Sequence, residues 1–210
     1  MFSPLYAIID PELAAIPLSD LAVELGAAGV TLIQLRDKKS PAAQVLARAR
    51  ELNAVLAPRG VRLILNDRPD IAAISDCAGV HVGQDDLPVE DARRIVGPSR
   101  WVGVSTHNQD QLRHAVATSA DYIAIGPIFP TSTKENPDPV VGLDFIRTAR
   151  QLTIKPLVAI GGITLEKAGD VFQAGADSVA VIRDIAAAKN PGERARAYLA
   201  VAENSRGSRS

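Results

Sequence analysis

The chain has 210 residues, of which 47% are hydrophobic and 22% charged, a composition typical of globular rather than fibrous or disordered proteins. Its 23 Lys and Arg residues balance 24 Asp and Glu residues, which argues against binding to nucleic acid or anionic membranes through gross charge. Cys77 is the only cysteine, so an intramolecular disulfide is excluded. With no signal-peptide pattern and no apolar stretch of about 18 residues, we expect a cytoplasmic protein.

Short apolar runs recur along the whole chain. Their interiors are nearly continuous in Val, Ile, Leu and Ala, which is typical of parallel strands covered on both faces. Segments long enough for a helix lie between them. The predicted strands cover residues 5–9, 30–35, 62–65, 79–82, 101–104, 122–125, 157–160 and 179–182.

Helix signals fall between these runs. Ser40 followed by Pro41 predicts the N-cap and first turn of a helix that stops near Pro58 and Gly60, and Thr164 predicts the N-cap of another over 165–174. Eight strand–helix units of about 26 residues account for the full length. We therefore predict an α/β fold, a single (β/α)₈ TIM barrel forming a catalytic domain over residues 1–203, with a disordered tail over 204–210. An open doubly wound sheet is the alternative.

Polar residues follow nearly every predicted strand. Active sites of (β/α)₈ barrels lie at the carboxyl ends of the strands. One Asp or one Gly pair at such a place could simply cap a helix or form a turn. Loops at the opposite rim, such as 59–60 and 97–98, show no comparable set, so we expect the site at the carboxyl ends. The polar residues there include Asp10, Gln34, Arg36, Lys38, Asn66, Asp67, His81, Gln84, Asp85, Asp86, Ser105 and His107.

Two carboxylates on neighbouring strand ends suit Mg²⁺. Asp67 and Asp86 could bind this hard ion while substrate phosphate and water complete the octahedron. Asp85 could replace Asp86, because spacing alone does not choose between them. Both carboxylates could instead merely cap helices.

Cations gather at the ends of the second and sixth predicted strands. Arg36, Lys38 and Lys134 would match a diphosphate, although a solvated charged rim is the alternative. Lys134 closes a hydroxyl-rich run, 131–134, inside a long loop of the kind that is usually functional.

A third subsite follows the last two strands. Gly161 and Gly162, together with Ile182 and Arg183, lie where barrels commonly bind phosphate through backbone N–H groups. Ser105 is best interpreted as a hydrogen-bond donor to phosphate, since nothing near it resembles a nucleophile elbow.

Six motifs together resemble the thiamine-phosphate synthase family over about residues 5–185. The resemblance implies a (β/α)₈ transferase, thiamine-phosphate diphosphorylase. That enzyme joins 4-amino-2-methyl-5-(diphosphooxymethyl)pyrimidine to 4-methyl-5-(2-phosphooxyethyl)thiazole, giving thiamine phosphate and diphosphate. The motifs are QLRDK at 34–38, NDR at 66–68, HVGQDD at 81–86, VGVS at 102–105, GPIF at 126–129 with TSTK at 131–134, and IGGI at 160–163.

The resemblance also implies roles for particular residues. It assigns Mg²⁺ to Asp67 and Asp86, and it makes Arg36, Lys38 and Lys134 catalytic, stabilising the departing diphosphate in a dissociative substitution. The pyrimidine diphosphate would contact Gln34, Arg36, Lys38, Asn66, Ser105 and Lys134, and the thiazole phosphate would contact Thr131, Ser132, Thr133, Gly162, Ile182 and Arg183.

Two positions depart from the family pattern. Ile9 stands where Thr is frequent, so a polar role at this position is lost. Arg183 stands where Ser is frequent, which preserves a contact through the backbone N–H but not one through a Ser hydroxyl. The alternatives to the synthase are a thiazole tautomerase-like isomerase on the same barrel and a non-catalytic phospho-ligand-binding barrel. The expected partners are small molecules, with a homo-oligomer as a further prediction.

Overall fold

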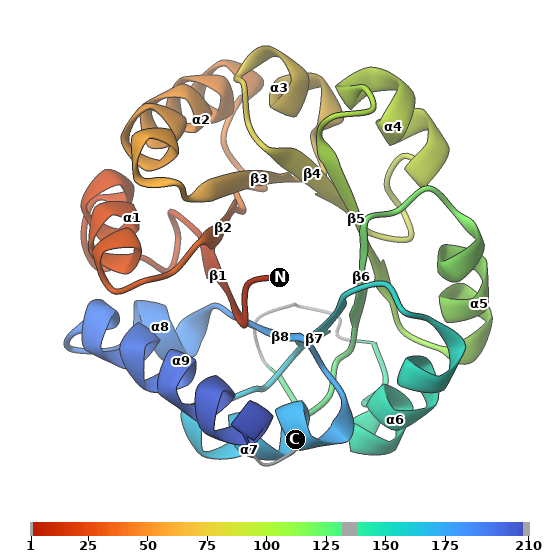
Figure 1. Ribbon diagram of the computed structural model, residues 1–210. Helices are drawn as coiled ribbons and strands as arrows, with labels where there is room; N and C mark the ends of the chain where they lie inside the picture. Colours follow the sequence, from red (N-terminus) through yellow and green to blue (C-terminus); the bar gives the residue numbers. More distant parts are fainter. Residues whose placement is uncertain (1, 132–137, 208–210) are drawn as a thin grey trace.

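The computed structural model describes residues 2–131 and 138–207, and within these ranges eight parallel strands close into a barrel surrounded by helices (Figure 1). Strand β1 pairs with both β2 and β8, which confirms the single (β/α)₈ barrel and rules out the open sheet. The strands are β1 (Leu5–Ile9), β2 (Leu32–Leu35), β3 (Arg62–Asn66), β4 (Gly79–Val82), β5 (Trp101–Thr106), β6 (Tyr122–Ile125), β7 (Leu157–Ile160) and β8 (Ser178–Val181).

One predicted strand begins too early. Strand β2 starts at Leu32 rather than at Val30, because the Val30 N–H closes the end of the preceding helix on the Leu25 carbonyl at 3.1 Å. Gly29, with φ of +97°, makes that helix end possible. Val30 is therefore a fully buried turn residue, which is why its apolar side chain continued the run.

Helices alternate with the strands, and α9 completes the outer ring between α7 and α1 (Figure 1). Pro41, not Ser40, is the N-cap of α2, since the Ser40 hydroxyl accepts a hydrogen bond from Arg48 instead. The helices are α1 (Leu18–Ala27), α2 (Ala42–Leu56), the 3₁₀ turn η1 (Ala57–Arg59), α3 (Pro69–Ile74), α4 (Val89–Val96), α5 (Gln109–Ala117), α6 (Gly142–Leu152), α7 (Leu165–Ala174), α8 (Arg183–Ala186) and α9 (Pro191–Gly207).

The predicted boundary between the barrel and a disordered tail, placed between residues 203 and 204, is wrong. Helix α9 continues through residues 204–207, because Ala202 and Ser205 in its last turns are still buried. The Ser205 hydroxyl donates to the Val201 carbonyl at 2.8 Å. The rest of the expected tail, 208–210, lies outside the described residues.

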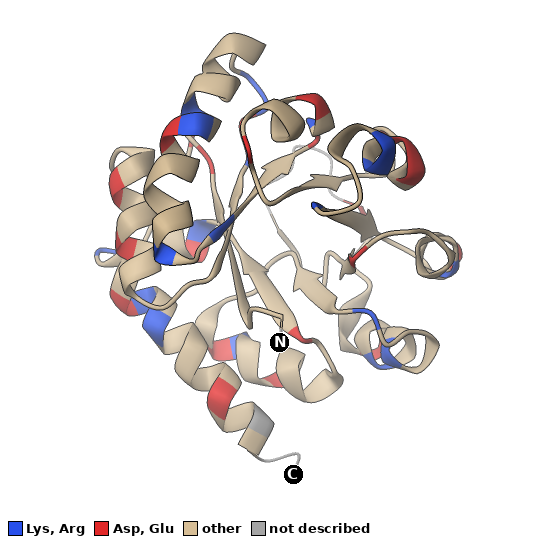
Figure 2. Ribbon diagram, turned by 45° about the horizontal axis from the view of Figure 1, so that its top comes forward, with Lys and Arg blue, Asp and Glu red and all other residues tan. Residues whose placement is uncertain are grey.

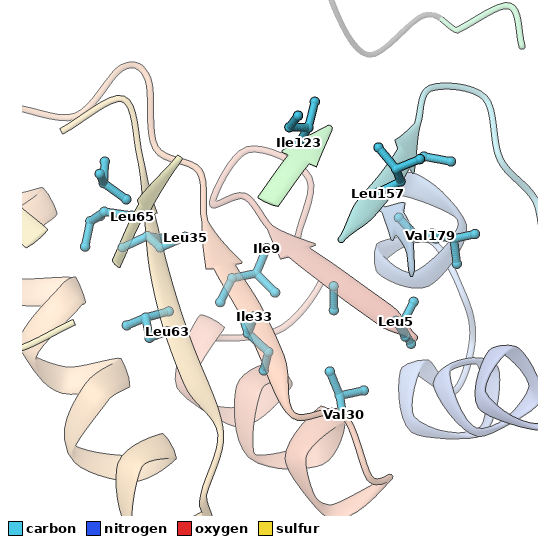
Figure 3. Close-up of a cluster of buried hydrophobic side chains, with 14 of the residues drawn as sticks. Leu5, Ile9, Val30, Ile33, Leu35, Leu63, Leu65, Ile123, Leu157 and Val179 are labelled. Atoms are coloured by element: carbon cyan, nitrogen blue, oxygen red, sulfur yellow. The ribbon is translucent and has the colours of Figure 1, made fainter. Parts of the chain in front are cut away.

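Successive side chains of each strand point to opposite faces, and both faces are buried. Leu5 and Ile9 pack outward against the helices with Ile33, Leu35 and Leu63 (Figure 3). The inner layer fills the barrel itself. It consists of Tyr6, Ile8, Leu32, Ile64, Tyr122, Ala124, Val158 and Ala180.

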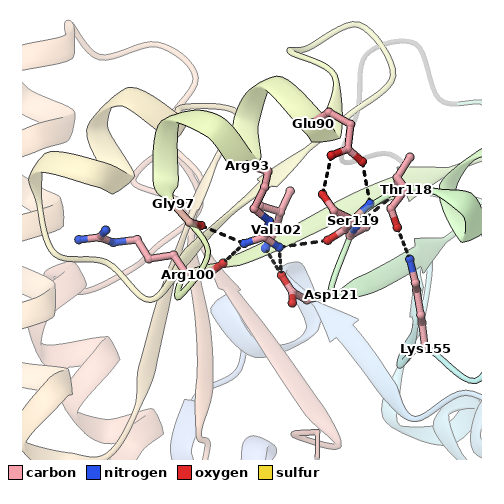
Figure 4. Close-up of polar contacts among 10 residues, drawn as sticks. Glu90, Arg93, Gly97, Arg100, Val102, Thr118, Ser119, Asp121 and Lys155 are labelled. Carbon is pink, nitrogen blue, oxygen red and sulfur yellow. Dashed lines mark hydrogen bonds and ion pairs between the residues drawn. The ribbon is translucent and has the colours of Figure 1, made fainter.

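The amino-terminal rim of the barrel is closed by aromatic packing and by ion pairs. The Phe2 ring stacks on Trp101 with centroids 5.4 Å apart, and the N-terminal segment lies inside the ring of strands (Figure 1). Figure 4 shows Arg93 donating to the carbonyl oxygens of Gly97, Arg100 and Ser119 and pairing with Asp121. The expectation that this rim lacks a polar constellation is therefore wrong, but its charges are engaged in tying loops together.

Charged residues of both signs are interspersed over the outer helices (Figure 2), in keeping with the balanced composition. No helix among the described residues is long and apolar enough to cross a membrane.

Candidate active site

A cavity of about 1040 Å³ opens at the carboxyl ends of the strands. Its lining draws on the end of every strand or the loop that follows it, as the fold predicts. Ser132, Thr133 and Lys134 lie outside the described residues. All the other predicted site residues line this cavity: Gln34, Arg36, Lys38, Asn66, Asp67, Asp86, Ser105, Thr131, Gly162, Ile182 and Arg183.

Asp67 and Asp86 lie close enough for their carboxyl groups to interact directly. Burial raises the pKa of Asp67, and Asp86 raises it further, while Lys38 acts in the opposite direction. Lys38 Nζ lies 3.0 Å from Asp67 Oδ2. The backbone of Asp67 is left-handed, with φ of +62°, a conformation that non-glycine residues adopt mainly at functional sites and turns.

Neither carboxylate caps a helix. Arg68 is the N-cap of α3 and Pro88 that of α4, and neither helix has a side-chain cap hydrogen bond. Asp86 Oδ2 instead accepts the Gly83 N–H at 2.7 Å, which turns the carboxyl group toward Asp67. Asp85 is exposed, so the geometry favours Asp86 of the two candidates.

The two carboxylates fit a hard divalent ion. Adjacent carboxylates repel each other, and a cation bound by both would relieve that repulsion. Among residues 2–131 and 138–207, no group of three or more His, Cys, Asp or Glu side chains is arranged to hold a metal. The remaining ligands would therefore come from substrate and water, the usual arrangement for Mg²⁺.

Arg36 is held in place by Asp10 at the end of β1. Its Nη1 atom donates to Asp10 Oδ2, and this aspartate is only 3% exposed. Asp10 Oδ1 also accepts the Glu12 N–H at 2.9 Å, which fixes the carboxylate. The sequence placed Asp10 at the rim without a role, and the structure shows that it orients the Arg36 guanidinium.

The glycine pair after β7 is required by space as well as by conformation. A Cβ atom on Gly162 would lie 2.4 Å from the Pro130 carbonyl oxygen, and φ at Gly162 is +64°. The Phe129 N–H donates to the Gly161 carbonyl at 3.0 Å. The loop after β6 therefore packs directly on the glycine pair. Thr131, in the same loop, lies at the wall of the cavity.

The sequence analysis missed the lining residue Lys167, and it named His107 at this rim without giving its partners. Lys167 Nζ lies 4.6 Å from the centre of the Phe129 ring, which holds this cation at the wall of the cavity. His107 Nδ1 bonds the Gly126 carbonyl oxygen at 2.6 Å, and His107 Nε2 lies 3.5 Å from Asp138 Oδ2. Lys167 falls inside a helical pattern, where nothing in the sequence distinguishes a cavity residue from a solvated one.

Helix α9 packs against α8, the short helix that follows β8. Arg194 binds Asp184 through Nε and Nη2, at 3.0 and 2.9 Å, and Tyr198 donates to the same carboxylate at 2.5 Å. Burial alone would raise the pKa of Asp184, but these hydrogen bonds outweigh it and lower that pKa. Arg183, next to Asp184 in α8, lines the cavity.

Fold and cavity together define a (β/α)₈-barrel protein whose cavity, at the carboxyl ends of the strands, is lined by cations and carboxylates as well as by apolar side chains. A sequence model described as thiamine monophosphate synthase matches residues 5–185, and the chain belongs to this family. This finding confirms the resemblance drawn from the motifs, and with it the expectation of a transferase enzyme of thiamine biosynthesis.

Individual relatives agree with the family. Thiamine-phosphate synthase of Koribacter versatilis is 54% identical over 202 residues, covering 94% of each chain. That of Shouchella clausii is 43% identical over 175 residues, covering 83% of this chain and 84% of the relative. Among solved structures, thiamine phosphate pyrophosphorylase from Pyrococcus furiosus superposes with a TM-score of 0.87 at 27% identity, covering 96% of both chains.

Proposed function

We propose that the chain catalyses the Mg²⁺-dependent condensation of 4-amino-2-methyl-5-(diphosphooxymethyl)pyrimidine with 4-methyl-5-(2-phosphooxyethyl)thiazole, giving thiamine phosphate and diphosphate. One observation carries the proposal: the adjacent carboxylates Asp67 and Asp86 share a cavity with Lys38 and Arg36 at one side and with Gly162 at another. A substrate with a diphosphate and a substrate with a single phosphate would each find a matching end.

The diphosphate end rests on cations and on the metal carboxylates. Arg36 and Lys38 would bind the diphosphate oxygens and stabilise the charge that develops as this group departs. Lys134 would join them, on the basis of the TSTK motif alone. Mg²⁺ held by Asp67 and Asp86 would neutralise the leaving group as a Lewis acid.

The bond changes need no covalent nucleophile from the protein. The C–O bond to diphosphate breaks first, and the 4-amino group of the pyrimidine donates electron density to the carbon left behind. The thiazole nitrogen then attacks that carbon. The chain's own contribution is to anchor both substrates so that nitrogen and carbon meet. Such alignment of two reactants can supply a large part of the rate enhancement of an enzyme.

The thiazole phosphate would lie at the ends of β7 and β8. Gly162, Ile182 and Arg183 would offer backbone N–H groups, and Thr131 its hydroxyl, together with Ser132 and Thr133. Lys167 adds a cation at this side of the cavity. A lone buried cysteine also fits the reducing cytoplasm in which we expect such an enzyme to work.

The decisive experiment incubates the purified chain with both substrates and Mg²⁺ and measures thiamine phosphate and diphosphate. Formation of both products in equal amounts supports the proposal. The proposal also requires that removal of Mg²⁺ by a chelator abolish the reaction and that added Mg²⁺ restore it. Absence of product at saturating substrate would refute it. Conversion of a thiazole substrate without use of the pyrimidine would favour the tautomerase-like isomerase.

Variants test the metal assignment. Asp67→Ala and Asp86→Ala should each lower the turnover rate by at least about 100-fold, because the departing charge loses its counter-ion. Asp85→Ala is the matched control, since this neighbour is exposed, and it should retain activity. Circular dichroism must show all three variants folded. An active Asp67→Ala protein would contradict the assignment.

A further inference from the structure

A chain of hydrogen bonds crosses the barrel at the floor of the cavity, and four of its five side chains line that cavity. Gln34 Nε2 donates to Tyr6 Oη at 2.8 Å, and Tyr6 Oη lies 2.9 Å from Tyr122 Oη. His81 Nδ1 lies 3.1 Å from Tyr122 Oη, and His81 Nε2 lies 2.9 Å from Ser105 Oγ. Five side chains from five different strands are therefore linked from one wall of the cavity to the other.

The middle of this chain is rigidly packed. Tyr6 and Tyr122 are 1% and 0% exposed, and the His81 ring stacks on Tyr122 with centroids 5.5 Å apart. Gly103 makes room for the phenol, because a Cβ atom there would lie 2.0 Å from Tyr122 Cζ. The proposed reaction uses none of these three aromatic groups, although they contact two of its expected substrate-binding residues.

Both phenols keep their protons. Burial raises the pKa of Tyr6 above its usual range, and burial together with Tyr6 raises that of Tyr122. Each hydroxyl therefore has one proton to donate and can accept at its oxygen. Neutral imidazole likewise has one donor and one acceptor nitrogen.

For a neutral His81 ring these inventories leave the chain two consistent directions, and the Gln34 amide, which donates through Nε2, selects one of them. With Gln34 Nε2 as donor, Tyr6 donates to Tyr122, Tyr122 donates to His81 Nδ1, and His81 Nε2–H donates to Ser105 Oγ. Reversing the chain requires the Gln34 amide to present its oxygen to Tyr6 and requires the other histidine tautomer. A half-reversed chain would bury a proton without an acceptor, at a considerable cost.

We propose that Tyr122 holds His81 in its Nε2–H tautomer. Both are positioning residues, because this tautomer fixes which hydrogen-bonding groups Ser105 and Gln34, at the two ends of the chain, present to the substrate. Ser105 accepts from His81 and has its hydroxyl proton left for a substrate acceptor. Gln34 donates one N–H of its amide to Tyr6, and this orientation leaves its carbonyl oxygen to accept from a substrate donor. An aminopyrimidine carries one of each, an amino donor and a ring-nitrogen acceptor.

The inference rests on the proposed function for the identity of the substrate, whereas the tautomer is a property of the chain alone. Two-bond ¹⁵N–¹H correlation spectra of ¹⁵N-histidine-labelled protein, recorded without substrate, distinguish the two tautomers directly. The chain has three histidines, and the variants His107→Gln and His114→Gln assign the His81 signals. The Nε2–H pattern is expected, and an Nδ1–H pattern or a rapid mixture of both would overturn the assigned direction.

Kinetics test the positioning role. Tyr122→Phe keeps the ring but removes the link to His81, so the KM for the pyrimidine diphosphate should rise about tenfold. The KM for the thiazole phosphate should change less than about twofold, and the His81 spectrum should become a mixture of tautomers. Equal changes in both KM values, or an unchanged KM for the pyrimidine, would reject the role.

Thr106→Val is the matched control. Thr106 follows Ser105 in β5 but faces the helices, is fully buried and donates one hydrogen bond, to the Ala124 carbonyl at 3.1 Å. Its loss should lower stability without changing either KM or the His81 spectrum. A wild-type protein that makes no thiamine phosphate would refute the proposed function while leaving the tautomer result standing, so the two failures are distinguishable.

Discussion

Gly162→Ala is the substitution whose effect the structure defines most sharply. The added methyl group would lie 2.4 Å from the Pro130 carbonyl oxygen and 2.8 Å from that of Phe129. Gly162 also has φ of +64°, a region that alanine adopts only at a cost of about 1 kcal/mol. The variant therefore suffers both conformational strain and a collision with the loop after β6.

The size of the collision sets the expected kinetic effect. The 2.4 Å contact is about 1 Å shorter than an ordinary Cβ contact, so the backbone of the glycine pair or of the loop must move by roughly that distance. A misplacement of about 1 Å can cost 100-fold in rate, equivalent to about 2.7 kcal/mol. We expect kcat/KM for the thiazole phosphate to fall by about that factor.

Gly60→Ala separates the two causes. Gly60 has φ of +71°, but a Cβ there would meet nothing within 4 Å, and the residue lies at the opposite rim. Both variants should lose about 1 kcal/mol of unfolding free energy through strain, measured by urea denaturation. Only Gly162→Ala should change kcat/KM, measured with the thiazole phosphate as the varied substrate. Unchanged kinetics in Gly162→Ala would refute the assignment of this glycine to the phosphate end.

Three further predictions concern stability and reactivity. Arg93→Ala should lower the Tm by about 4–8 °C, because Arg93 makes two part-buried and two exposed hydrogen bonds that tie the loops of this rim together, whereas Arg113→Ala, which removes an exposed helical pair, should shift it by less than about 1 °C. Because hydrogen bonds lower the pKa of Asp184 against the effect of burial, its contribution is complete above pH of about 4 and is lost as the pH falls further. The stability difference between wild type and Asp184→Asn should therefore shrink between pH 5 and pH 3 in urea titrations, and a pH-independent difference would contradict this reasoning. Burial raises the pKa of Cys77 to about 11, so a thiol reagent at pH 8 should label it only after unfolding, and rapid labelling of the native chain would show that the site opens.

The barrel could be predicted because both faces of its strands are buried. Continuous apolar runs such as 157–160 mark strands regardless of which way each side chain points, and β7 occupies those residues. The same property explains the error at Val30, which is buried in a turn instead of a strand. Ser40 failed as a cap because its hydroxyl binds Arg48, eight residues away, a contact that local sequence does not show.

The sequence was enough to predict which rim of the barrel carries the candidate site, but not which of its side chains contact each other. Position after a strand was enough to bring Asp67 and Asp86 into one cavity. It could not show that Asp10 holds Arg36, or that two tyrosines 116 residues apart share a hydrogen bond. Such partners depend on which strands face each other across the closed ring, and that is known only once the ring is built.

The ring closes through its first and last strands, and this has a consequence for synthesis. Leu5 pairs with Val179 and Ala7 with Val181, so β1 has no partner on one side until β8 has emerged from the ribosome. At about 5–20 residues per second, the interval is on the order of ten seconds or more. During that time β1 presents an open edge of unpaired amide groups, a template for pairing with a neighbouring nascent chain. We therefore expect slow translation upstream of β8 to lengthen this exposure and to lower the yield of folded protein.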